Sequence, residues 1–252
     1  MRVRAVAGGA AAVLALAGCT AAPPPAEGLA GELTVFAAAS LQGAFDALGA
    51  EFSAQHPGVT VHPTTYDGSA TLATQLVGGA TADVFAAADL ETMGTVTDAG
   101  LADGTPTVFT TNTLEIVVAP GNPLGIDSLA DLATLSTSGG KVVLCAAQVP
   151  CGSAAGAVLD GLTLSPVSEE QNVKAVLTKV QTGDADAGLV YWTDVLAAGA
   201  TVEGVEFPEA ATAVNEYPVV VLEDTAVARA FVDLVLSAEG QRLLTDLGFT
   251  AP

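Results

Sequence analysis

The fold of this chain is decided by residues 33–52, which read LTVFAAASLQGAFDALGAEF. The apolar run at 33–37 predicts a buried strand, and the apolar residues from Leu41 to Phe52 recur at the spacing of an amphipathic helix. Ser40 stands between these two segments, where the strand ends and the helix begins. A strand that passes directly into a helix is the repeating unit of an α/β protein.

The alternation of strands and helices continues along the chain. Strands are expected at 59–65 and 84–87, and helices at 71–77 and 90–99. Together with residues 33–52 they make a βαβαβα order, which implies a mostly parallel sheet covered by helices on both faces.

A second alternation follows a turn-rich stretch at 100–113 and begins with a strand at 114–119. Its further expected elements are helices near residues 128–135, 153 and 173, strands at 142–146, 187–191 and 217–222, and a helical end at 226–247. Two α/β halves fit this order better than one continuous sheet.

The first 18 residues predict secretion. Arg2 and Arg4 precede a short apolar run at 5–16, which has the length and flanks of a signal peptide rather than of a membrane-spanning helix. The Leu-Ala-Gly-Cys sequence that ends at Cys19 resembles the lipobox of bacterial lipoproteins, in which the cysteine carries the lipid. An ordinary signal peptide with a chance cysteine is the alternative. Residues 19–30, with three consecutive prolines, then predict a stiff tether to the membrane, which the chain touches through its lipid anchor only.

The charge of the chain limits its partners. The sequence has 7 Lys and Arg against 28 Asp and Glu, a net charge of -21. Nucleic acids and anionic membrane surfaces need clustered basic residues, so neither is expected as a partner. A small anion is still possible, because the N–H groups at helix starts carry partial positive charge. An acidic surface that only aids solubility is the alternative.

Two cysteines remain after the N-terminal segment, Cys145 and Cys151. In a secreted chain a disulfide between them is expected, and two free buried thiols are the alternative. A zinc site is disfavoured because no histidine lies nearby to complete four ligands.

Two serines occupy the turns in which α/β sheets bind ligands. Ser40 follows the first predicted strand, and Ser69 follows the second. Ligands of such sheets bind at the carboxyl ends of the strands, where the next helix begins. Each serine could cap its helix or turn its hydroxyl to a ligand, and the pattern leaves both readings open.

Five short segments occur in order along the chain. They are VFAAASL at 35–41, GSATLATQL at 68–76, ADVFAAAD at 82–89, GLVY at 188–191 and EYPV at 216–219. Together they resemble the periplasmic molybdate-binding proteins of ABC importers. The resemblance covers residues 32–249 and implies a type II periplasmic-binding-protein fold, whose two lobes close over a tetrahedral oxyanion. It implies one lobe at 31–112 plus 217–252 and another at 113–216, with a hinge near Leu114 and Tyr217.

The same resemblance implies five oxyanion-binding residues. They are Ser40, Ser69, Cys151, Val173 and Tyr191. Ser40, Ser69 and Tyr191 would donate through hydroxyls, and Cys151 and Val173 through backbone amides. Taken alone, Tyr191 reads as an ordinary half-buried aromatic residue. A disulfide at Cys151 would tie a ligand-donating turn to the preceding strand.

The helix that contains Val173 has two possible starts. Ser168-Glu169-Glu170-Gln171 has the spacing of a capping box, which would place the Val173 amide in an internal hydrogen bond. The resemblance instead requires Asn172 as the N-cap, so that the Val173 amide stays free. The local sequence favours Ser168, and the resemblance favours Asn172.

A site that offers hydrogen-bond donors and no acceptors favours a fully deprotonated anion. Molybdate and tungstate meet this condition, sulfate meets it but is smaller, and phosphate near neutral pH carries a proton that needs an acceptor. Asp67 and Asp194 are potential acceptors that we expect to lie outside the pocket as turn or capping groups.

An enzyme and a carrier of another solute are the alternative functions. The only histidines are His56 and His62, and no nucleophile motif or Walker-type loop accompanies them. An organic anion would usually recruit an arginine, and the arginines lie far from the five segments. We therefore expect a monomeric binding protein without cofactor or cationic metal, and the resemblance implies a membrane permease as its partner.

Overall fold

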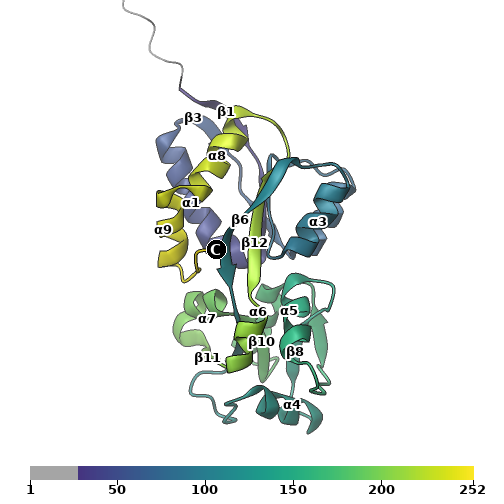
Figure 1. Ribbon diagram of the computed structural model, residues 1–252. Coiled ribbons are helices and arrows are strands. Elements are labelled where there is room, and N and C mark those ends of the chain that lie inside the picture. Colours follow the sequence, from purple (N-terminus) through teal and green to yellow (C-terminus); the bar gives the residue numbers. More distant parts are fainter. Residues whose placement is uncertain (1–27) are drawn as a thin grey trace, which may run out of the picture.

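The computed structural model describes residues 28–252. The expected signal peptide at 1–18, the lipidation at Cys19 and most of the tether at 19–30 lie outside the described residues. Figure 1 shows two lobes stacked end to end, one made of the purple, blue and yellow parts of the chain and the other of the teal and green parts. Within residues 28–252, no helix has the length and apolar character needed to cross a membrane.

The first lobe, called lobe 1 here, is built on a five-stranded sheet in the order β4-β2-β5-β12-β6. The strands are β2 (Val35–Ala38), β4 (Thr65–Asp67), β5 (Val84–Ala86), β6 (Asp103–Asn112) and β12 (Asn215–Val221). A small parallel pair, β1 (Ala30–Leu33) with β3 (Gly58–Val61), adds to this lobe.

Helices cover both faces of the lobe 1 sheet. They are η1 (Ala39–Leu41), α1 (Gln42–Gln55), α2 (Ser69–Val77), α3 (Leu90–Asp98), α8 (Ala226–Leu236) and α9 (Ala238–Asp246). Under α1 and α8, Phe45 packs edge-on against Phe109 and Phe231, with ring centroids 5.9 and 6.0 Å away. On the opposite face, Leu72 of α2 and Met93 of α3 bury a second, smaller core. The chain therefore forms lobe 1 from its beginning and its end.

The second lobe, lobe 2, is built on a sheet in the order β11-β7-β10-β8-β9. Its strands are β7 (Leu114–Val118), β8 (Val142–Cys145), β9 (Ser168–Glu170), β10 (Ala187–Tyr191) and β11 (Glu203–Val205). Its helices are α4 (Leu129–Thr137), α5 (Pro150–Val158), α6 (Val173–Gln181), α7 (Trp192–Ala198), η2 (Gly199–Thr201) and η3 (Pro208–Thr212). Both sheets are mixed, with two parallel and two antiparallel neighbour pairs in each. The expected α/β class is thus confirmed, but the expectation of mostly parallel sheets is wrong, because β12 in lobe 1 and β7 in lobe 2 each run antiparallel to both of their neighbours.

Three predicted elements differ from those in the structure. The stretch at 100–113, predicted to be turns, contains the long strand β6, which pairs antiparallel with β12. Its Gly104 and Pro106 suggested turns, but β6 is an edge strand, where a residue without an N–H group is tolerated. The strand expected at 59–65 is two strands, β3 and β4. The helix expected at 226–247 ends at Leu236, and the hydroxyl of Ser237 caps α9 by accepting a hydrogen bond from the Gly240 amide at 3.1 Å.

Two adjacent connections join the lobes. Thr113 links β6 to β7, and Val214 leads into β12, whose first residue Asn215 pairs with Asn112 at the end of β6. The Asn112 side chain donates a hydrogen bond to the Thr193 hydroxyl of lobe 2 at 2.8 Å. Figure 1 shows β6 and β12 running side by side toward the second lobe.

One carboxyl group is buried in the lobe 2 sheet. Glu115 of β7 is only 3% exposed, and its Oε2 atom has no hydrogen-bond partner within residues 28–252. Glu206 lies one residue beyond the paired Val205 and Ile116, opposite Glu115. Burial, and secondly the charge of Glu206, raise the pKa of Glu115 to about 7.

We predict that Glu115→Gln stabilises the protein increasingly as the pH rises from about 5 to about 7, and by a constant amount above that. Below its ordinary pKa the Glu115 carboxyl is protonated in both states, and between that value and about 7 only the unfolded chain ionises. Wild-type stability therefore falls over this window relative to the variant, by on the order of 3 kcal/mol at most. Urea unfolding between about pH 5 and pH 8 measures the difference, with the exposed Glu209→Gln as control. A difference that does not change with pH would contradict the prediction.

Candidate functional site

A small cavity lies between the two lobes, and all five predicted site residues line it. Ser40 and Ser69 line it from lobe 1, and Cys151, Val173 and Tyr191 line it from lobe 2. The centre of a water-sized molecule has about 20 Å³ of room in the cavity. Taken as a sphere and widened by the radius of a water molecule, about 1.4 Å, this is a hole roughly 3 Å in radius, which suits one small inorganic ion. The complete lining is Ala38, Ala39, Ser40, Gly68, Ser69, Ala88, Val149, Pro150, Cys151, Gln171, Asn172, Val173 and Tyr191.

Helix starts converge on this cavity. Ser69 is the first residue of α2, Val173 is the first residue of α6, and Cys151 is the second residue of α5. The first amides of a helix have no acceptor within it, and they carry its positive dipole end. In α5, the first residue is Pro150, which has no N–H group, so that Cys151 supplies the first amide of the helix.

The two serine hydroxyls do not cap helices. The N-cap residue of η1 is Ala38 and that of α2 is Gly68, and neither helix has a side-chain cap. The Ser69 hydroxyl accepts a hydrogen bond from the Ala88 amide at 3.0 Å, which leaves its own proton free to donate. The Ser40 hydroxyl lies 3.2 Å from the Tyr217 hydroxyl, and either group can be the donor. The capping alternative is therefore absent at both positions.

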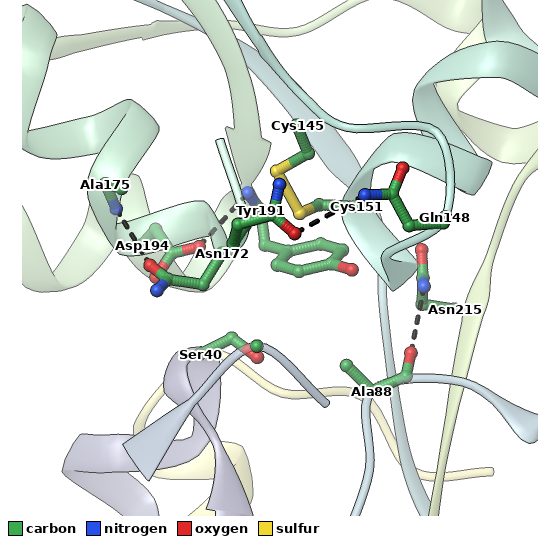
Figure 2. Close-up of a disulfide and its surroundings, with 12 residues drawn as sticks. Ser40, Ala88, Cys145, Gln148, Cys151, Asn172, Ala175, Tyr191, Asp194 and Asn215 are labelled. Atoms are coloured by element: carbon green, nitrogen blue, oxygen red, sulfur yellow. Dashed lines mark hydrogen bonds between the residues drawn. A yellow bond between two sulfur atoms is a disulfide. The ribbon is translucent and has the colours of Figure 1, made fainter. Parts of the chain in front are cut away.

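Tyr191 places an unpaired hydroxyl at the cavity. Its side chain is 1% exposed, and its hydroxyl has no hydrogen-bond partner in the described part of the chain. Burial, and secondly the neighbouring Tyr217, raise the pKa of Tyr191 well above its ordinary value, so the phenol is neutral and can donate. Its ring packs edge-on against that of Tyr217 across the lobes, with centroids 6.0 Å apart. Figure 2 shows the Tyr191 ring between the disulfide and Ser40.

The helix of Val173 begins where the resemblance requires. Asn172 is the N-cap of α6 and accepts a hydrogen bond from the Ala175 amide at 3.0 Å, as drawn in Figure 2. The capping box at Ser168 does not form, because residues 168–170 are β9 and pair with β8. The Asn172 side chain also donates to Asp67 of lobe 1 at 2.9 Å. Asn172 thus caps α6 and also links lobe 2 to lobe 1 through a side-chain hydrogen bond.

Sequence reasoning missed the role of Lys174. Its ammonium group lies 2.8 Å from Asp194, whose side chain is fully buried. Burial raises the pKa of Asp194, and Lys174 opposes this shift. Asp194 also accepts a hydrogen bond from the Tyr191 amide at 3.2 Å. A lysine in the first turn of a helix is unfavourable to the helix dipole, and this signal could have marked Lys174 as the partner of a buried acid.

Neither Asp67 nor Asp194 lines the cavity. Asp67 accepts from the Gly68 amide at 2.7 Å and from Asn172, so it acts at the turn before α2. No carboxylate side chain is among the lining residues, and the polar side-chain atoms that line it come from hydroxyls and amides.

The lobes touch closely beside the cavity. A Cβ atom added to Gly68 would collide with the carbonyl oxygen of Gln171 in lobe 2. The backbone conformation of Gly68, φ -57° and ψ 134°, is one that any residue adopts. Glycine is therefore required at this position by the approach of the lobes and not by the turn.

A disulfide joins Cys145 to Cys151, with Cα atoms 5.7 Å apart. Cys145 ends β8 and Cys151 lies in the first turn of α5, so the bond ties the strand to the turn that lines the cavity (Figure 2).

Comparison with known proteins identifies the family. The family model for bacterial extracellular solute-binding proteins matches residues 33–250, and the chain belongs to this family. The molybdate-binding protein ModA of Mycobacterium tuberculosis is 52% identical to this chain over 233 residues, which are 90% of this chain and 87% of that protein.

Two solved structures share the fold. The periplasmic molybdate-binding protein of Azotobacter vinelandii matches with a TM-score of 0.73 and 21% identity, over 87% of this chain and 99% of that one. The sulfate-binding protein SubI of Mycobacterium tuberculosis matches with a TM-score of 0.75 and 19% identity, over 87% of this chain and 86% of that one. The expected periplasmic-binding-protein fold is thus confirmed, and its family works outside the cytoplasm.

We predict that removing the disulfide costs stability without unfolding the protein. The loop that it closes is short, so the chain-entropy model gives a loss of roughly 2 kcal/mol for Cys145→Ser with Cys151→Ala. Urea unfolding measures the loss, and the wild-type protein in reductant should show the same value. Unfolding midpoints that coincide with and without the bond would contradict the prediction.

Proposed function

We propose that this protein captures molybdate, and also tungstate, between its lobes and delivers it to the permease of an ABC importer. The observation that carries the proposal is the buried Tyr191 hydroxyl without a partner, at a cavity that four further potential donors line. Similarity over most of the chain to a molybdate-binding protein, at 52% identity, supports the choice of ligand.

The donor set selects the charge state of the ligand. Hydroxyls of Ser40, Ser69 and Tyr191 and the amides of Cys151 and Val173 can all donate to oxyanion oxygens. No carboxylate lines the cavity to accept a proton from the ligand. A fully deprotonated tetrahedral anion is therefore favoured over phosphate, which carries a proton near neutral pH.

The positive ends of helix dipoles offset the charge of the anion. The cation nearest in sequence to the site residues, Lys174, is paired with Asp194, and no lysine or arginine lines the cavity. Bound anions at helix starts are stabilised by amides and dipole without a formal countercharge. This explains how a chain with a net charge of -21 can hold a dianion.

Sulfate is the second candidate, because SubI shares the fold. Sulfate has the required charge but a smaller radius, and a donor shell fixed by two closed lobes favours the anion that reaches both. A hydrolase is disfavoured, because neither His56 nor His62 lines the cavity with the serines.

The proposal also covers the membrane anchor of the protein and the movement of its lobes. A lipid on Cys19 would anchor a monomer to the outer face of the cell membrane. The lobes, 31–112 with 217–252 and 113–216, would open and close about the connections near Leu114 and Tyr217.

We predict that Tyr191→Phe weakens molybdate binding by about 10- to 100-fold, because a hydrogen bond to a charged group contributes about 1.5–3 kcal/mol. Isothermal titration with molybdate, tungstate, sulfate and phosphate measures the effect. Tyr66→Phe is the matched control, because Tyr66 bonds Asp46 on the surface of lobe 1 and does not line the cavity. Ser40→Ala with Ser69→Ala should abolish binding, and Ser53→Ala should not.

Binding of sulfate or phosphate in place of molybdate would overturn the proposed ligand and keep the site. Equal molybdate affinities for Tyr191→Phe and Tyr66→Phe would instead overturn the site.

We also predict that Gly68→Ala impairs closure. The added methyl group would meet the Gln171 carbonyl only when the lobes approach, so folding is spared and molybdate affinity falls by about tenfold or more. Gly94→Ala is the control, because a Cβ there meets no atom within 4 Å. Neither variant should lose thermal stability without ligand, and unchanged affinity in Gly68→Ala would refute the closed arrangement as the binding state.

A further inference from the structure

A second cavity lies in lobe 2 beside the connection at Thr113, and the centre of a water-sized molecule has about 410 Å³ of room in it. It opens between β7, the start of α7 and the segment 206–211. Thr113, Glu115, Trp192 and Glu206 supply its polar groups, and Leu114 and Phe207 are among its apolar walls. It shares no lining residue with the cavity between the lobes.

Two carboxylates face this cavity without a counterion. Glu115 is 97% buried, given its 3% exposure, and its Oε2 atom has no hydrogen-bond partner in the described chain. Glu206 stands opposite it across the strands. Within residues 28–252, none of the ion pairs of lysine, arginine or histidine includes either glutamate. Like charges placed opposite each other across a sheet are destabilising, and a buried carboxylate without a partner is costly.

An indole ring completes the cavity. Trp192 is 38% exposed, although it is the largest apolar side chain in the sequence. Its amide is held by the Thr113 carbonyl at 2.9 Å. A Cβ added to Gly248 of lobe 1 would lie 3.1 Å from the indole nitrogen, so the ring is seated against the other lobe. Tryptophan is the aromatic side chain that best attracts a cation to its face.

We propose that this cavity binds a small organic cation, an alkylammonium or alkylguanidinium. The cationic head would pair with Glu115 and Glu206 beside the Trp192 ring, and the alkyl part would lie on Phe207 and Pro208. The room available exceeds what a single inorganic ion needs. In the described chain, no group of three or more histidine, cysteine, aspartate or glutamate side chains is placed to hold a metal ion. The lining thus fits an organic cation better than a divalent metal.

The single tryptophan of the chain allows a direct test. The full chain is titrated with butylammonium and butylguanidinium at about pH 8, where Glu115 is ionised, and Trp192 emission is recorded. Uncharged 1-butanol is the matched probe for the alkyl part. We expect a saturable change with either cation, and none with 1-butanol. Saturating molybdate should not compete with the cation, so the saturable response to the cation should persist in its presence, which separates this site from the proposed anion site.

Three glutamate variants locate the response. Glu206→Gln should weaken cation binding by about tenfold or more, as should Glu115→Gln. Glu209→Gln removes the same charge from the same segment outside the lining and should bind like the wild type. Glu206 and Glu209 are both exposed, so the comparison of these two variants does not depend on any change in the core. Equal affinities in Glu206→Gln and Glu209→Gln, an equal response to 1-butanol, or no response to either cation would overturn the proposal, and saturation by Ca²⁺ alone would overturn the organic ligand.

Discussion

Hydrogen-bond donors without acceptors, gathered where two lobes meet, are the constraint on which the rest of the structure depends. A buried donor left unpaired costs about 1–3 kcal/mol. The Tyr191 hydroxyl is such a donor, and α2, α5 and α6 all begin at the same cavity. Their convergence needs two sheets whose strand ends face each other, and it needs the chain to cross twice between lobes at adjacent points. The paired ends of β6 and β12 meet this need.

Much of the fold could be predicted from local pattern, and the errors have a common cause. Apolar runs and helical spacing located the strand before Ser40 and the helix after it, because those residues are buried by their own lobe. The strand β6 was missed, because its glycine and proline are typical of turns and only its partner β12, about 100 residues later in the chain, makes it a strand. The place of β9 was likewise fixed by β8, which overrode the capping pattern at Ser168.

The site could be predicted only through resemblance, and the structure explains why. In the proposed site Val173 and Cys151 would donate through backbone amides, which no side-chain pattern reveals. Ser40 and Ser69 looked equally suited to capping, and only the contacts of Ser69 with Ala88 and of Ser40 with Tyr217 separate the readings. Lys174 and Glu115 matter because of burial. The buried Asp194 lies next to Lys174, whereas the buried Glu115 has no cation beside it. Such facts depend on packing between distant segments and not on composition.

The disulfide between Cys145 and Cys151 means that the wall of the cavity is completed in a particular cellular compartment. Disulfides form in oxidising compartments and are rare where thiols are kept reduced. Inside the cell, where thiols are kept reduced, the bond that ties the start of α5 to β8 is not expected to form. The covalent bond is added after export, so the wall of the cavity reaches its final form on the side of the membrane where an extracellular binding protein works.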